Sequence, residues 1–195
     1  MRTIEDFLVH FRRQRDWTHS LVAVIPEEHF DWRPHKTAFS CGGVVRHLML
    51  SEGFWQGQIP AALAGEPFDP FGLEGTGVER FAAFRPINLS ASRNDRQGRL
   101  GSTFARCLER WREIQARTEA ILSPIRPEQL AEVVVDHPLM ALRLPLWEML
   151  LYMVNHEVHH RGQLSAYLKV LGVEQPAMLG MPGMPGTPGM PEISA

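Results

Sequence analysis

Cysteine and long apolar runs are scarce in this sequence of 195 residues. The two cysteines, Cys41 and Cys107, are too few for a disulfide framework. No run of ~18 apolar residues occurs, so we expect no membrane-spanning helix. The first residues, MRTIEDFLVHFRRQ, lack the charged and then apolar pattern of a signal peptide. We therefore expect a cytoplasmic protein whose thiols stay reduced.

The sequence also lacks an excess of either charge. Its 20 basic and 22 acidic residues give a net charge of −2, so the composition does not indicate a nucleic acid or an anionic membrane as a partner. Arginines are concentrated between Arg93 and Arg117, but no nucleic-acid recognition motif accompanies them, and a solvated helix face explains them better. We expect neither nucleic acid nor membrane among the partners.

Four segments have apolar residues three and four positions apart, which is the spacing of an amphipathic helix. Thr3 and Ser40 are suitable N-terminal caps. Pro145 suits a first helical turn, and Gly172 suits a helix end. The expected helices run from 3 to about 23, from 40 to about 58, from 102 to 122 and from 145 to about 171. They predict an all-α fold, a four-helix bundle with long crossover connections.

The segments between these helices are rich in proline and glycine. Within the long connection from 65 to 101 we expect one short helical turn, at 78–84. A short extended stretch is expected from Val133 to Val135. The end of the sequence repeats Gly-x-Pro too few times for a collagen-like helix. We expect residues 1–176 to form the bundle and residues 177–195 to form an extended or disordered Gly-Met-Pro-rich tail outside it.

The stretch NHEVHHRGQ, residues 155–163, places three histidines in the most apolar of the expected helices. Its segment from His156 to His160 matches the H-E-x-x-H motif of zinc proteases. The protease interpretation lacks its context, because position 166 is alanine where metzincins have a third histidine. Neither Glu174 nor Glu192 is well placed as a third ligand, and no strand-rich half is present to bind a peptide substrate. The motif alone does not predict a protease.

A different third ligand is available on another expected helix. His156 and His160 are four residues apart, so a helix places them ~5–6 Å apart at Cβ, where both can reach one ion. His47 lies on the inner apolar stripe of the second helix, and bundles build ligand sites from facing helices. A lone buried histidine is more often a core residue. Together with the pair, however, His47 favours a three-histidine metal site over coincidence.

These residues carry a family resemblance. The motif VVRHLMLSEGFW around His47, followed by LWEMLLYMVNHEVHHRGQLSAYLKVLG, resembles the DinB/YfiT family of metal-binding four-helix bundles. The resemblance covers Thr3 to Gly172 and implies that His47, His156 and His160 bind a divalent metal. Zinc is our first choice, with nickel, manganese or iron as alternatives, since imidazole binds them all. Departures from the family pattern are the 65–101 connection and the Gly-Met-Pro tail.

Five further residues are candidates for the same site. Glu157 is a candidate catalytic residue that moves protons or orients a ligand, or else a polar contact between helices. His159 is a second catalytic candidate, or an exposed surface residue. Arg161 is a candidate for binding a substrate carboxylate, although such an arginine more often pairs with a structural carboxylate. Trp55 and Tyr152 are candidates for lining the substrate pocket, although such aromatics are more often core.

The resemblance also suggests a reaction, because relatives include bacillithiol S-transferases and mycothiol-dependent isomerases and are often homodimers. It implies a low-molecular-weight thiol S-transferase of stress or detoxification, with a small thiol and an electrophile as substrates. The first alternative is a non-catalytic metal-binding stress protein. The second is a metal-dependent hydrolase. Three histidines leave one coordination position open, whereas structural zinc sites close all four, so an enzyme is favoured.

Overall fold

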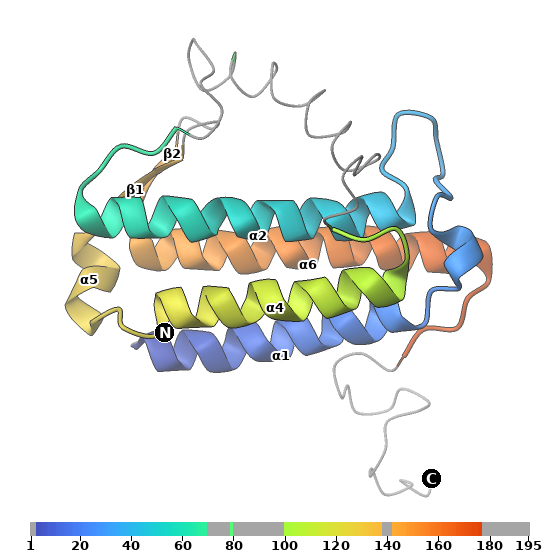
Figure 1. Cartoon of the computed structure of the whole chain (residues 1–195), viewed down its shortest axis with the longest axis horizontal. Coiled ribbons are helices and arrows are strands. Elements are labelled where there is room, and N and C mark those ends of the chain that lie inside the picture. The colour runs from blue at the N-terminus through green and yellow to red at the C-terminus, as the bar shows by residue number, and fades with distance from the viewer. Residues whose placement is uncertain (1–2, 70–78, 80–99, 138–141, 177–195) are drawn as a thin grey trace, which may run out of the picture.

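The computed structural model describes residues 3–69, 79, 100–137 and 142–176. Four long helices lie side by side in these residues (Figure 1): α1 (Ile4–Ala23), α2 (Cys41–Ala64), α4 (Phe104–Leu122) and α6 (Leu146–Leu171). The prediction of an all-α four-helix bundle is confirmed. The tail at 177–195 lies outside the described residues, as does the helical turn expected at 78–84 except for Glu79.

The order of the helices around the bundle is α1, α4, α2, α6, because α1 and α2 each pack against both α4 and α6. The colours in Figure 1 show that α2 and α4 run in the same direction, opposite to α1 and α6. The connection between α2 and α4 must therefore return along the length of the bundle, which is the predicted crossover. Within the described ranges, no helix has the length and apolar character needed to span a membrane.

Local side-chain chemistry sets the helix ends. The Thr3 hydroxyl accepts the Asp6 amide, and the Asp6 carboxylate accepts the Thr3 amide, both at 3.1 Å. Ser40 Oγ accepts the Gly43 amide at 3.0 Å at the start of α2. Helix α6 ends at Gly172, whose φ of 69° is a conformation that glycine adopts without strain. These three ends were predicted from the sequence.

Helix α2 is longer than predicted, since it continues past Pro60 to Ala64 rather than ending near Gln58. A proline inside a helix removes one backbone hydrogen bond. Here Ile59 is buried and Leu63 packs against the core, so apolar burial on both sides of Pro60 outweighs that loss. Tertiary packing therefore overrides the local stop signal.

The start of α4 lies two residues later than expected, with Thr103 as its cap. The carboxylate of Glu27, which lies in the 3-10 turn η1 (Glu27–His29), also accepts the amides of Phe104 and Ala105, at 2.9 and 3.2 Å. Pro145 precedes α6 as its cap rather than occupying its first turn. The starts of α4 and α6 were thus predicted to within one or two residues, unlike the end of α2.

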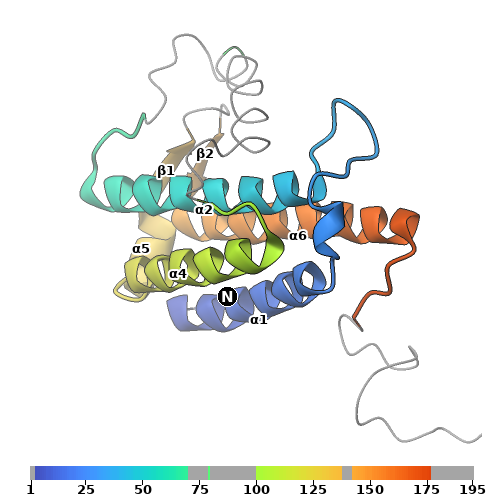
Figure 2. The same cartoon turned by 45° about the vertical axis from the view of Figure 1, so that its right-hand side comes forward.

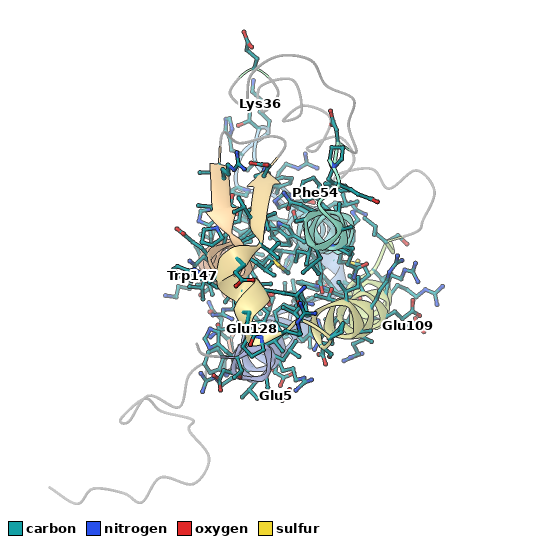
Figure 3. All side chains as sticks on the ribbon, turned by 90° about the vertical axis from the view of Figure 1, so that its left-hand side faces the viewer. Glu5, Lys36, Phe54, Glu109, Glu128 and Trp147 are labelled. Atoms are coloured by element: carbon teal, nitrogen blue, oxygen red, sulfur yellow. The ribbon has the colours of Figure 1, made fainter. Side chains whose placement is uncertain are left out.

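One end of the bundle carries a small cap that the sequence predicted only in part. It comprises α5 (Pro127–Glu132), which we did not expect, and the antiparallel strands β1 (Val134–His137) and β2 (Leu142–Pro145). Only the extended stretch at Val133–Val135 was predicted. Figures 2 and 3 show the strands beside α2 and α6, and contacts join both of those helices to β1. The cap therefore brings strand residues to the two helices that carry the three histidines.

Candidate metal centre

The three predicted histidines meet inside the bundle. His47 comes from α2, and His156 and His160 come from successive turns of α6. One ring nitrogen from each lies within 4.8 Å of the others, and His47 Nε2 is 3.1 Å from His156 Nε2. His47 and His160 are buried, and His156 is half-buried. The structure thus brings together, from positions 109 residues apart, the three side chains that could hold a metal ion.

The donor geometry fits a divalent ion. Two nitrogens bound to one ion at tetrahedral angles are about 3.3 Å apart when each bond is ~2.0–2.1 Å. The 3.1 Å between His47 Nε2 and His156 Nε2 is close to that value. Ring nitrogens at this distance need a proton or a cation between them, because two lone pairs facing each other repel. The nitrogen cluster is therefore suited to a cation.

The protonation of the cluster fits metal binding as well. Burial, together with the neighbouring imidazoles of His160 and His47, lowers the pKa of His156 to about 2. Burial likewise lowers the pKa of His160 to about 4, with His47 contributing. Both rings are therefore neutral at pH 7, which is the form that binds metals.

Neighbouring side chains hold two of the rings in place. His160 Nδ1 donates to Gln163 Oε1 at 2.8 Å, which leaves Nε2 of His160 with a free lone pair. The amide nitrogen of Gln163 lies 3.2 Å from His159 Nε2. The Phe39 ring stacks on His47, with 4.9 Å between centroids and 21° between planes. These contacts restrict the rotation of His47 and His160.

Aromatic side chains line one side of the cluster. Trp55 meets His156 edge-on with centroids 5.4 Å apart, and Tyr152 lies 6.4 Å from Trp55. Trp55 thus contacts one of the three histidines and Tyr152 contacts Trp55, and their role in lining a substrate pocket remains a prediction. His137 on β1 lies 6.1 Å from Tyr152 and 5.3 Å from Phe54, and burial lowers its pKa to about 4.

Sequence reasoning missed His137 as a neighbour of the site. It has no partner histidine at helical spacing, and its position depends on pairing between β1 and β2, of which only the first was predicted. The sequence feature that indicates His137 as a neighbour of the site is its position at the end of an extended stretch between two bundle helices.

The remaining candidates on α6 point elsewhere. Glu157 accepts hydrogen bonds from Arg15 of α1, at 3.2 and 3.1 Å from Nε to its two oxygens and at 2.9 Å from Nη2. Arg161 donates to the backbone oxygen of Gln14 at 2.9 Å and to its side-chain oxygen at 2.8 Å. His159 is exposed beside His160. The structure places Glu157 and Arg161 in contacts with α1, in agreement with the structural alternatives, and their catalytic and binding roles remain predictions.

A buried charge cluster next to the histidines was also missed. Arg15 Nη1 lies 2.8 Å from Glu52 Oε2, so one guanidinium contacts both Glu52 and Glu157. Glu52 also accepts from Trp111 Nε1 at 2.8 Å and from Thr118 Oγ1 at 2.6 Å. The three charged side chains are between 2% and 5% exposed. Burial acts to lower the pKa of Arg15, because it disfavours the charged form. The two carboxylates have the larger combined effect, so the pKa of Arg15 is raised.

This Arg15–Glu52–Glu157 cluster connects all four long helices, since Trp111 and Thr118 belong to α4. Its signal in the sequence is a charged residue inside an apolar stripe: Arg15 follows Phe11 by one turn, and Glu52 follows Leu48 by one turn. A charged residue within an apolar stripe is either exposed at its edge or buried with a partner of opposite charge. The sequence alone does not identify that partner.

Comparison with known proteins places the chain in a family. A sequence model of the DinB family matches residues 1–184. The uncharacterized protein YjoA of Bacillus subtilis is 23% identical over 163 residues, which is 84% of this chain and 87% of that protein. A crystal structure of a DinB-like protein from Bacillus cereus superposes with a TM-score of 0.61 at 20% identity, covering 91% of this chain and 99% of the other. With the fold and the three-histidine cluster, the match over nearly the whole sequence shows that the chain belongs to the DinB family.

Proposed function

We propose that this protein is a metal-dependent enzyme whose ion is held by His47, His156 and His160. The observation that carries the proposal is the group of three ring nitrogens within 4.8 Å of one another. Among the residues that the structure describes, no further His, Cys, Asp or Glu joins that group. A divalent ion bound there has an open coordination position, at which it lowers the pKa of a thiol or a water molecule.

The reaction that we propose is S-transfer from a low-molecular-weight thiol to an electrophile. The resemblance to thiol-using members of the family supports it, and so does the aromatic wall of Trp55 and Tyr152, which suits an apolar electrophile. Burial keeps His156 and His160 neutral, so they stay ligands at the pH where thiols react. His159, exposed beside His160, is available to contact an anionic group of the thiol.

Zinc is the metal that we propose first, because three imidazoles and one open position form a known type of catalytic zinc site. Nickel, manganese and iron bind the same ligands. Metal analysis of protein purified without chelators is the first measurement, on wild type and on His47→Ala. His35→Ala is the matched control, because His35 is exposed and bonds only locally to Thr37. Unchanged metal content in His47→Ala would contradict the three-histidine assignment.

Activity is tested with the metal-loaded protein, several bacterial thiols and a chromogenic electrophile. We expect conjugate formation by wild type and His35→Ala, and only background for His160→Ala. No conjugate above that background with any thiol would reject the transferase.

A non-catalytic metal-binding stress protein is the second candidate, favoured by the placement of the ligands on two helices that an ion would tie together. A large fall in Tm on metal removal, with neither thiol transfer nor hydrolysis in the loaded protein, would support it. A hydrolase shares the same ligands, and ester or amide cleavage without a thiol would identify it.

A further inference from the structure

A small cavity lies between the four long helices, directly beside His156. Its polar lining consists of Arg15, Glu52, Trp55, His156 and Glu157, and apolar side chains complete it. The volume open to the centre of a water molecule is about 10 Å³, which is room for about one water. The cavity therefore joins the metal-ligand cluster to the buried charge cluster.

Three polar atoms of the lining residues, Arg15 Nη1, Trp55 Nε1 and His156 Nδ1, are buried without a hydrogen bond among the described residues. Arg15 Nη1 is nevertheless 2.8 Å from the Glu52 carboxylate in an ion pair, which leaves the other two to be explained. Neither Trp55 Nε1 nor His156 Nδ1 forms a hydrogen bond with any residue that the structure describes. An indole nitrogen only donates, and a neutral imidazole with its other nitrogen on a metal donates through the remaining N–H. Both atoms therefore need an acceptor, and a buried donor without one is strongly unfavourable.

The acceptors in the cavity lining are carboxylates. Glu52 and Glu157 share a single guanidinium, that of Arg15, at 2.8 and 2.9 Å. Arg161 of α6 is also buried and interacts electrostatically with Glu157, so two guanidinium groups lie near the two carboxylates. These carboxylates are acceptors in the lining to which a bridging water can join the two buried donors.

We propose that one water molecule in this cavity links His156 to the buried carboxylates, and that Glu52 and Glu157 are positioning residues for the metal ligand His156. The water accepts from His156 Nδ1–H and Trp55 Nε1–H and donates to Glu52 and Glu157, which satisfies both orphan donors. This arrangement keeps the proton on Nδ1 and the lone pair of Nε2 towards His47 and the ion. The inference rests on the metal centre proposed above.

The two proposed metal ligands of α6 would then be held in different ways. His160 is oriented directly by the neutral amide of Gln163, at 2.8 Å. His156 is oriented through water by a charged network that reaches α1 and α4. Changing a side chain that orients a metal ligand typically weakens metal affinity by about 10–100-fold. The charged network predicts an effect of that size for a residue that does not touch the metal.

A direct test is to determine the position of the proton on His156 in zinc-loaded, isotope-labelled protein by long-range proton–nitrogen NMR. We expect Nδ1 protonated and Nε2 metal-bound. A crystal structure of the same protein should show one ordered water within hydrogen-bond distance of His156 Nδ1, Trp55 Nε1 and a carboxylate oxygen. Coordination through Nδ1, or a cavity without ordered water, would overturn the inference.

Metal affinity tests the roles of the positioning residues, by competition with a chromogenic chelator. Glu157→Gln should bind zinc about 10–100-fold more weakly than wild type. Trp55→Phe removes one hydrogen bond to the water without changing charge, and should weaken binding by a smaller factor. The matched control is Glu119→Gln, which removes a different interhelical ion pair, 2.9 Å from Arg12, and should leave affinity unchanged.

Circular dichroism of each variant shows whether it is folded. If Glu157→Gln does not fold, the zinc affinity of Trp55→Phe and the NMR measurement test the inference. Wild-type affinity in folded Glu157→Gln and Trp55→Phe would reject the inference while leaving the metal centre intact. Failure of the wild-type protein to bind any of the four metals would reject both.

Discussion

Polar residues on the two sides of α6 differ in their hydrogen bonding. On the side facing α2, His156 and His160 present ring nitrogens to one another and to His47, with few hydrogen bonds to other side chains. On the side facing α1, Glu157 and Arg161 form hydrogen bonds with Arg15 and Gln14. Buried polar groups that find all their partners specify the structure, whereas a convergent group that needs an external partner indicates a binding site. Within about one helical turn, α6 thus carries residues paired with α1 and residues that could hold a metal ion.

The largest expected effect comes from breaking the buried ion pairs on the side of α6 that faces α1. Arg15→Met leaves two buried carboxylates without their cation and should lower the free energy of unfolding by about 3–5 kcal/mol. Denaturant unfolding measures it. Arg12→Ala is the matched control, because Arg12 also links α1 to a glutamate but is 42% exposed, and it should cost less than about 1 kcal/mol. Equal losses in the two variants would contradict a special role for the buried cluster.

Removing one of the histidines on the side of α6 that faces α2 should leave the metal-free fold nearly intact. It should abolish the stabilisation of the protein by metal. A metal at about 100 times its Kd stabilises the wild-type protein by about 2.7 kcal/mol. We expect His160→Ala to show the same Tm with and without zinc, whereas His35→Ala responds like wild type. A zinc-dependent rise in Tm for His160→Ala would show that the ion binds elsewhere.

In the metal-free protein, acid should lower the stability of the fold by protonating buried histidines such as His160. The pKa of His160 is about 4 when folded and near 6.5 when unfolded, so the unfolded state binds the extra proton between these values. The contribution of His160 to stability is thus complete above pH 6.5 and is lost as the pH falls towards 4, by up to about 1.4 kcal/mol per pH unit. His160→Gln should reduce the slope in that window by the contribution of one histidine, because burial also lowers the pKa of His19, His137 and His156. An unchanged slope would show that another group accounts for the acid sensitivity.

The smallest effect is expected at Gln163, which holds His160 from outside the cluster. Gln163→Leu removes the acceptor of the Nδ1–H and should weaken zinc binding about 10-fold with no change in the fold, measured by chelator competition and circular dichroism. Gln175→Leu, at a glutamine bonded to Ser165 near the end of α6, should leave zinc affinity unchanged. Equal affinities in both variants would remove Gln163 from the site.

The sequence predicted features that depend on local chemistry. Thr3, Ser40 and Gly172 mark helix ends through their own hydrogen bonds or backbone preference, and the four-residue spacing of His156 and His160 is a property of any helix. The meeting of His47 with that pair was also predicted, because apolar stripes show which helix faces turn inward.

Features that depend on partners distant in the sequence were harder to predict. Helix α2 continues past Pro60 because residues on both sides of it are packed. His137 reaches the aromatic wall only through the pairing of β1 with β2. The pairing of Arg15 with Glu157 joins residues 142 positions apart, and no local pattern identifies which buried carboxylate a buried arginine will meet. These contacts follow from the packing of the helices.

The distance in sequence between His47 and the pair on α6 has a consequence for the making of the protein. During synthesis His47 leaves the ribosome 109 residues before His156, an interval of roughly 5 to 20 s at ordinary translation rates. For all that time the nascent chain offers a metal only one of the three nitrogens. With the metal centre proposed above, capture of the ion would wait until α6 has been made and has docked, so a loaded site would mark a polypeptide whose four helices have assembled.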